Sequence, residues 1–138
     1  MYAFDNDDML IASGGTAGYC AVAKKEDSPY DLEYIQAWLA NTYTEKLFNI
    51  LGSDFEGGFV SRGTFVLSSL PFVKLDFDDP KQKALYDRVV EASREVYTIN
   101  DKLNQKPAKQ IETTLVRQKE SLIKEIEGLI SRVYRLEF

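Results

Sequence analysis

The spacing of apolar residues in the last 60 positions constrains the fold of this chain more than any other feature. The first series falls at intervals of four and three residues: Leu85, Val89, Ala92, Val96, Ile99 and Leu103. A second series follows a seven-residue repeat, with Lys119 at one inward position: Leu115, Leu122, Ile126, Leu129, Val133 and Leu136. This spacing places apolar side chains along one face of a helix. The sequence therefore predicts two long helices.

The residues between and before the two series define the ends of these helices. Asp79 and Pro80 form a helix-start signal, since proline is tolerated at the first helical position. Residues 104–107 (Asn-Gln-Lys-Pro) interrupt the pattern after one helix and favour a tight turn. We expect an antiparallel, coiled-coil-like helical hairpin over residues 79–138, each helix roughly 37 Å long at 1.5 Å per residue.

Apolar residues beside the two series widen the face that the hairpin can bury: Val90, Val116, Ile123 and Ile130. One interpretation is an autonomous hairpin that packs on the first half of the chain. The other is a spacer or dimerisation arm that docks on another domain or subunit. We favour docking on a neighbour, so that the chain can form a homo-oligomer through the hairpin.

The first half of the chain has a mixed pattern. Met9–Ala12 and Tyr19–Ala23 read as short strands flanking a glycine-containing turn, whose glycine spacing matches no phosphate-binding fingerprint. A helix follows, with Asp31 as its cap, and ends near Leu51, where Gly52 supplies a left-handed conformation. The predicted class is α+β: a small β-hairpin or sheet core with a packed helix in residues 1–78, then the helical hairpin in residues 79–138.

A glycine-bracketed connector joins the helix to the second half. It begins with Gly57-Gly58-Phe59, contains Arg62, and ends at Leu70-Pro71-Phe72. Residues 65–70 read as a short helical turn stopped by Pro71, and residues 72–77 as an extended segment. Loops held by rigid elements often carry function, so this connector is the first candidate site.

Composition excludes several classes of protein. The chain has no histidine and one cysteine, Cys20, which excludes a histidine base and an internal disulfide and argues against a structural zinc site. No apolar run reaches the eighteen or so residues of a membrane helix, and no secretory signal opens the sequence. We expect a cytoplasmic protein without a membrane segment and without a cofactor or metal of its own.

Charge is unevenly distributed. Residues 1–78 carry five basic and twelve acidic groups, whereas residues 79–138 carry twelve basic and ten acidic groups. An acidic first half is unusual for a free-standing nucleic-acid binder, which normally presents a basic patch. Charge alone therefore favours a protein–protein interaction or oligomerisation module.

The order of the motifs nevertheless resembles a known family. The glycine-containing hairpin, a helix of the type Leu-x-x-Ile-Leu-Asn-Ser (here residues 34–42), Gly57-Gly58-Phe59, Leu70-Pro71-Phe72 and an Asp-Pro helix start occur in that order. This is similar to the TaqI-like C-terminal specificity, or target-recognition, domain of adenine-N6 DNA methyltransferases and type IIG restriction–modification enzymes. The Leu-Pro element and helical spacer also resemble the type I specificity subunit.

The resemblance implies sequence-specific recognition of double-stranded DNA. In that family a separate N-terminal domain binds S-adenosylmethionine and transfers the methyl group through an Asn-Pro-Pro-Tyr motif. No Asn-Pro occurs in this chain. The chain would thus lack catalytic residues, and a parent methyltransferase, with or without a fused endonuclease, would supply catalysis and cofactor.

The candidate DNA-binding residues lie in two places. Arg62, with Ser61 and Thr64 beside it, has donors suited to base edges, and arginine pairs bidentately with guanine. Lys24 and Lys25 follow the second predicted strand and suit phosphate contacts. The competing interpretations are a surface ion pair between Arg62 and Glu56 or Asp54, and simple solvation of the two lysines.

Overall fold

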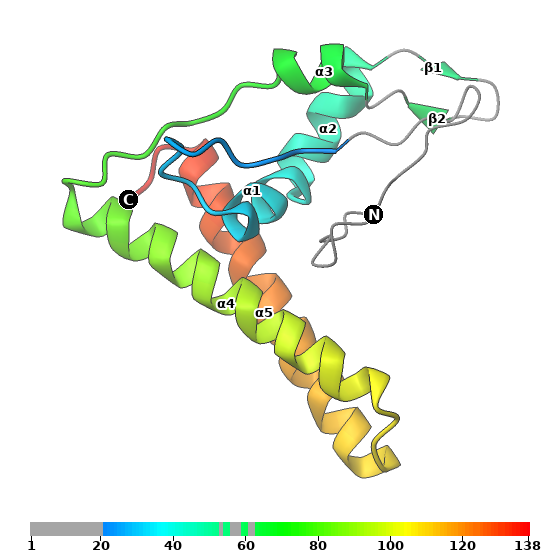
Figure 1. The fold of residues 1–138 in the computed structure, drawn as a ribbon. Coiled ribbons are helices and arrows are strands. Elements are labelled where there is room, and N and C mark those ends of the chain that lie inside the picture. The colour runs from blue at the N-terminus through cyan, green and yellow to red at the C-terminus, as the bar shows by residue number, and fades with distance from the viewer. Residues whose placement is uncertain (1–20, 53, 56–58, 61–62) are drawn as a thin grey trace.

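Two long helices dominate the structure, a computed structural model that describes residues 21–52, 54–55, 59–60 and 63–138. They are α4 (Pro80–Asn104) and α5 (Lys109–Tyr134), which lie side by side as a hairpin (Figure 1). Three shorter helices and a pair of two-residue strands precede them: α1 (Leu32–Leu39), α2 (Thr42–Leu51), β1 (Asp54–Phe55), β2 (Phe59–Val60) and α3 (Thr64–Ser69).

The predicted α+β class is wrong for the described part of the chain. Its β-structure consists of one antiparallel ladder in which Asp54 pairs with Val60 and Phe55 with Phe59. Residues 21–23, the described end of the predicted second strand, form no strand, and the remainder of that predicted hairpin lies outside the described residues. Helices supply the core, because the large apolar side chains of the first half pack on α4 and α5 rather than on a sheet.

The hairpin follows the predicted pattern closely. Asp79 caps α4, accepting a hydrogen bond from the Lys81 amide at 2.9 Å, and Pro80 is the first helical residue. Four seam residues form a buried cluster along the two helices: Ala92, Ile99, Leu115 and Leu122. The seam ends earlier than expected, because α5 stops at Tyr134 and Leu136 is 66% exposed beyond it.

The predicted single helix over residues 31–51 is two helices. Asn41 separates them in an extended conformation, and its side-chain oxygen accepts a hydrogen bond from the Tyr43 amide at 2.9 Å, capping α2. Gly52 ends α2 in an extended conformation, with φ −77° and ψ 154°, so the predicted left-handed glycine is also wrong. Asp31 does stand at the start of α1, but its side chain makes no capping hydrogen bond.

An aromatic cluster holds α1 against the base of the hairpin. Edge-on and tilted ring contacts with centroids 4.9 to 6.4 Å apart join residues from α1, α4 and the segments on either side: Tyr30, Tyr34, Trp38, Phe72, Phe77 and Tyr86. Such pairs add about 0.5–1.5 kcal/mol beyond the area they bury. Two hydroxyl groups also link distant segments, because Tyr30 accepts from the Leu75 amide and Tyr86 from the Asp31 amide.

The four apolar residues beside the seams divide into two pairs. Val90 and Ile130 are buried at 5% and 0% exposure in the core that α1 completes. Val116 and Ile123, nearer the hairpin turn on α5, are 38% and 46% exposed. The base of the hairpin therefore packs on the first half of its own chain. Docking on another subunit, and the division of the chain at residue 78, stay predictions.

The Tyr34 hydroxyl supports one prediction about stability. It is buried and, among the described residues, has no hydrogen-bond partner, and burial raises the pKa of this phenol. Tyr34→Phe should leave the free energy of unfolding unchanged or raise it by about 1 kcal/mol, since an unpaired buried hydroxyl is unfavourable. Tyr30→Phe is the matched control and should cost about 1–3 kcal/mol, because it leaves the Leu75 amide unpaired. Equal losses for both variants in urea unfolding would contradict this account.

Candidate nucleic-acid interface

The connector that carries the predicted base-reading residues is described only in part. Ser61 and Arg62 lie outside the described residues. Thr64 is the first residue of α3 and is exposed, and Phe65 beside it is 80% exposed. Helix α3 packs on α2 through its buried Val66, and the chain then ends the helix at Leu70 before Pro71. The predicted short helix is thus confirmed, and it presents Thr64 to solvent.

Lys24 belongs to an ion-paired group at the start of α1. Its Nζ lies 2.9 Å from Asp31 Oδ1, and the other oxygen of Asp31 lies 3.7 Å from Arg94 Nη2 on α4. Arg94 also donates to Glu33 at 2.9 Å. The hydrogen bond from Lys24 lowers the pKa of Asp31, so this carboxylate stays charged well into the acid range. A phosphate that contacted Lys24 would compete with Asp31.

Lys25 has no such partner among the described residues. It is exposed, and its backbone carbonyl accepts a hydrogen bond from the Ser28 amide at 3.0 Å in a turn before α1. Lys24 and Lys25 therefore lie in the segment that leads into α1, whereas Thr64 begins a helix that packs on α2. The structure places the two predicted groups on different elements, and no described contact joins them.

A second ion-paired group crosses the hairpin. Arg88 on α4 donates to both carboxylate oxygens of Glu125 on α5, at 2.7 and 2.8 Å, and also contacts Glu91 and Glu95 on its own helix. The bidentate bond from Arg88 lowers the pKa of Glu125. This group lines a wide polar hollow along one side of the hairpin. Five carboxylates (Asp31, Asp87, Glu91, Glu95 and Glu125) and three cations (Arg88, Arg94 and Lys102) line the hollow, so its net charge does not favour an anion.

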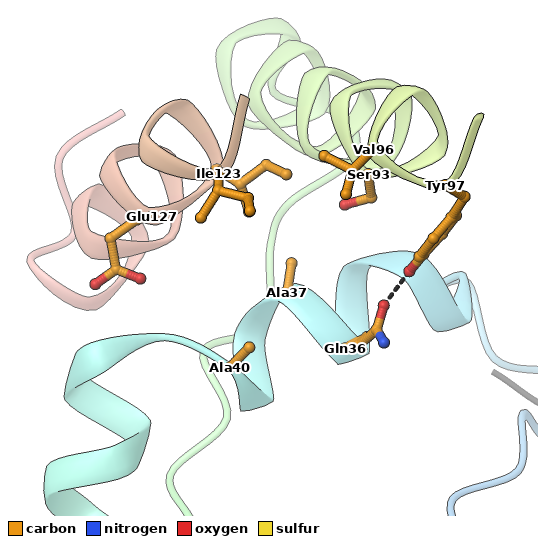
Figure 2. Close-up of a pocket in the computed structure, with 9 residues that line it drawn as sticks. Gln36, Ala37, Ala40, Ser93, Val96, Tyr97, Ile123 and Glu127 are labelled. Atoms are coloured by element: carbon orange, nitrogen blue, oxygen red, sulfur yellow. Dashed lines mark hydrogen bonds between the residues drawn. The ribbon is translucent and has the colours of Figure 1, made fainter. Parts of the chain in front are cut away.

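The opposite side of the hairpin has an apolar pocket of about 220 Å³ between α1, α4 and α5 (Figure 2). Ala37 and Ala40 of α1 form its floor, while Val96 and Ile123 line it from the hairpin. At one end Tyr97 donates a hydrogen bond to the side-chain oxygen of Gln36. Ser93 of α4 and Glu127 of α5 also line it, but the lining is mainly apolar, so the pocket suits an apolar side chain.

The titratable side chains outside the pocket have structural partners or, among the described residues, none. The aspartate and glutamate residues in the described part of the chain form no cluster able to hold a metal ion. No described helix combines the length and the apolar character needed to cross a membrane. Hydrogen bonds within ion pairs lower the pKa values of Asp31 and Glu125. Hydrogen bonds from the Gln82 side chain and the Lys81 amide lower the pKa of Asp79. Such shifts indicate structural roles.

Asn41 is the residue whose importance the sequence pattern alone did not reveal. It is 1% exposed and joins three elements, because it caps α2 and donates through Nδ2 to the Glu127 carbonyl and the Ser131 hydroxyl of α5, at 3.2 and 3.4 Å. The Thr42 amide also donates to the Glu127 carboxylate. An asparagine between two short apolar stretches is the available signal, since asparagine favours helix caps.

Comparison with known proteins finds a relative for part of the chain. No known protein-family profile matches the chain, and no solved structure matches it. Over 88 residues, or 64% of its length, the chain is 43% identical to the Escherichia coli protein described as type II restriction enzyme and methyltransferase RM.Eco57I. That alignment spans 9% of the relative's length. This chain is therefore related to a small segment of a restriction–modification enzyme.

Proposed function

We propose that this chain is a DNA target-recognition module, of the TaqI-like C-terminal specificity type, in a restriction–modification methyltransferase. The observation that carries the proposal is the 43% identity to a segment of an enzyme described as both restriction enzyme and methyltransferase. A segment spanning 9% of that protein leaves ample room elsewhere for catalytic parts. The order of motifs in residues 34–80 supports the same function.

The geometry of the described residues suits a recognition role. Among them no cluster could hold a metal ion, and the pocket between α1, α4 and α5 is lined mainly by apolar side chains. Helix α3 instead holds the end of the glycine-bracketed connector on a packed scaffold, with Thr64 and Phe65 exposed. A rigid support of this kind lets a loop enter a DNA groove without a large ordering cost.

The remaining activities of such an enzyme would lie outside this chain. Methyl transfer requires S-adenosylmethionine and a catalytic motif, and the sequence lacks the Asn-Pro that the family uses. We assign both to an N-terminal methyltransferase domain of the parent protein. The role proposed for the chain itself is selection of the DNA sequence, with Arg62 reading a base edge and Lys24 or Lys25 contacting phosphates.

Replacement of Arg62 tests the proposal directly. The chain is first used to select preferred duplexes from a random pool, and affinities are then measured by fluorescence anisotropy. Arg62→Ala should weaken binding to the preferred duplex about 5- to 150-fold and leave binding to random duplex unchanged, because a bidentate arginine–guanine pair supplies roughly 1–3 kcal/mol of discrimination. Lys24→Ala should weaken binding to all duplexes alike.

Arg135→Ala is the matched control for this measurement. Arg135 is exposed and paired with Glu137 beyond the end of α5, so its loss removes an equal charge far from the connector in sequence. Its effect on the preferred duplex should match its effect on random duplex. If Arg62→Ala also lowered both affinities equally, Arg62 would be a phosphate contact and not a base reader.

A protein–protein interaction module is the second candidate function. The exposed pair Val116 and Ile123, together with the apolar pocket beside Ile123, favours it, because contiguous exposed apolar surface marks interaction sites. The selection experiment separates the two functions. A recognition module enriches particular duplexes from the pool, whereas an interaction module enriches none at any salt concentration.

A further inference from the structure

The far end of the helical hairpin is the most basic part of the chain. Residues 100–119, which include the turn between α4 and α5, carry five basic and two acidic side chains, for a net charge of +3. Because the whole chain carries −5, all other residues together carry −8. We refer to the five cations as the tip cluster: Lys102, Lys106, Lys109, Arg117 and Lys119.

None of the five tip cations has an ion pair among the described residues. On the rest of the described hairpin Lys81, Lys124 and Arg132 also lack one, whereas Lys83, Arg88, Arg94 and Arg135 are paired. Near the base of the hairpin, Arg88 is shared by three glutamates, Arg94 by Asp31 and Glu33, and Lys83 pairs with Asp87. At the tip, four of the five cations are exposed and Lys119 is half-buried. Their charge is therefore available to an external anion.

The fold carries this cluster away from the rest of the described chain, α1, α2, α3 and the base of the hairpin, which we call the body. The core shared with the first half of the chain reaches Val90 on α4 and begins at Ile126 on α5. Beyond Ile99 and before Leu122 the two helices pack on each other alone. At 1.5 Å per residue, that leaves about 8 Å of α4 and about 20 Å of α5. Figure 1 shows the turn between them extending away from α1, α2 and α3.

From this separation of charge we infer that the hairpin tip is a phosphate-binding site for the backbone of duplex DNA. The inference rests on the proposed function and adds a second contact to it. An acidic body repels a polyanion, and Lys24 is already paired with Asp31, so the exposed cations of the tip are the stronger source of attraction. Exposed amide side chains at the same end add neutral donors to phosphate oxygens: Asn104, Gln105, Gln110 and Gln118.

This site would position the chain on DNA without reading its sequence. Backbone contacts set register and add salt-dependent affinity, while base contacts select the sequence. The acidic net charge of the chain is then compatible with DNA binding, because the local field at the tip, and not the overall charge, meets the duplex.

The test compares two triple variants of the full chain by their salt dependence on a preferred and a random duplex. The tip variant is Lys102→Gln, Lys106→Gln and Lys109→Gln. The control is Lys46→Gln, Lys74→Gln and Lys81→Gln, three exposed lysines of the body. Each lost phosphate contact lowers the slope of log affinity against log salt by about 0.9. On both duplexes the slope of log affinity against log salt should be about 2.7 smaller in the tip variant than in the unmodified chain, and almost unchanged in the control.

The outcomes separate this site from the proposed function. If the tip variant binds both duplexes with the slope of the unmodified chain, the tip site is wrong even where sequence preference persists. If no duplex is preferred but the tip variant still loses its slope, the recognition function is wrong and the tip site stands. Sedimentation of the same proteins covers the remaining alternative. If the unmodified chain self-associates, the tip variant does not, and DNA affinity is unchanged, the tip cations bind the acidic body of a second copy. That outcome would overturn the inference.

Discussion

Ile130→Ala should lower the free energy of unfolding by about 2–5 kcal/mol, the range for isoleucine truncated to alanine in a packed core. Ile130 is fully buried where α5 meets α1 and the base of α4. Its removal deletes apolar contacts and leaves a cavity that rigid helices on both sides cannot readily close. Urea unfolding followed by circular dichroism would measure the loss.

Ile123→Ala provides the control within the same helix. Ile123 lies two turns before Ile130, and the same substitution removes the same atoms from a side chain that is 46% exposed. We expect a loss of less than about 1 kcal/mol, because less surface is taken out of water in the folded state. Similar losses at the two positions would mean that Ile123 is covered in solution, which would favour the protein–protein interaction module.

Asn41→Ala should cost about 2–4 kcal/mol. The substitution removes the cap of α2, typically worth about 1 kcal/mol, and also the two hydrogen bonds to α5. Asn41 is nearly inaccessible to water, so the Glu127 carbonyl loses a donor and the Tyr43 amide an acceptor without replacement by solvent. Asn49→Ala, on the exposed side of α2, should change stability by less than about 0.5 kcal/mol.

Asn41→Asp distinguishes the cap from the link to α5. Aspartate caps a helix as well as asparagine does, yet it has no amide to donate and would place a buried carboxylate beside the Glu127 carbonyl. We expect Asn41→Asp to be at least as destabilising as Asn41→Ala at neutral pH, with part of the loss recovered in acid as the carboxyl is protonated. Full stability in Asn41→Asp would show that Asn41 acts as a cap alone.

The hairpin was predictable because its determinants are local. Seam residues such as Val89 and Leu122 repeat along one helix face, and Pro80 and residues 104–107 mark the ends, so neighbours in sequence suffice to define both helices. The short helix before Pro71 was predictable for the same reason. The extent of the seam was not, because Leu136 fits the repeat but lies past the point where α5 ends.

The candidate site was predictable only at the level of residue type. Lys24 and Thr64 are suitable donors in any sequence, but the pairing of Lys24 with Asp31 depends on how the chain enters α1. The further contact of Asp31 with Arg94 joins residues far apart in the chain. The isolation of the tip cluster likewise depends on where the body stops packing on the hairpin. Spacing in a sequence does not report such distances.

By itself, the amino-acid sequence determined the helical hairpin, its start at Asp79 and the accumulation of cations near its turn, because helix periodicity, capping and charge are properties of neighbouring residues. The tertiary structure alone decided that residues 21–23 form no strand and that Asn41 divides one apolar stretch into two helices. It also decided that Val90 and Ile130 are buried while Val116 and Ile123 are exposed. The physical reason is that whether an apolar side chain is buried depends on which distant segment packs against it. Here the packing of α1 against the base of α4 and α5 decides which apolar side chains are removed from water.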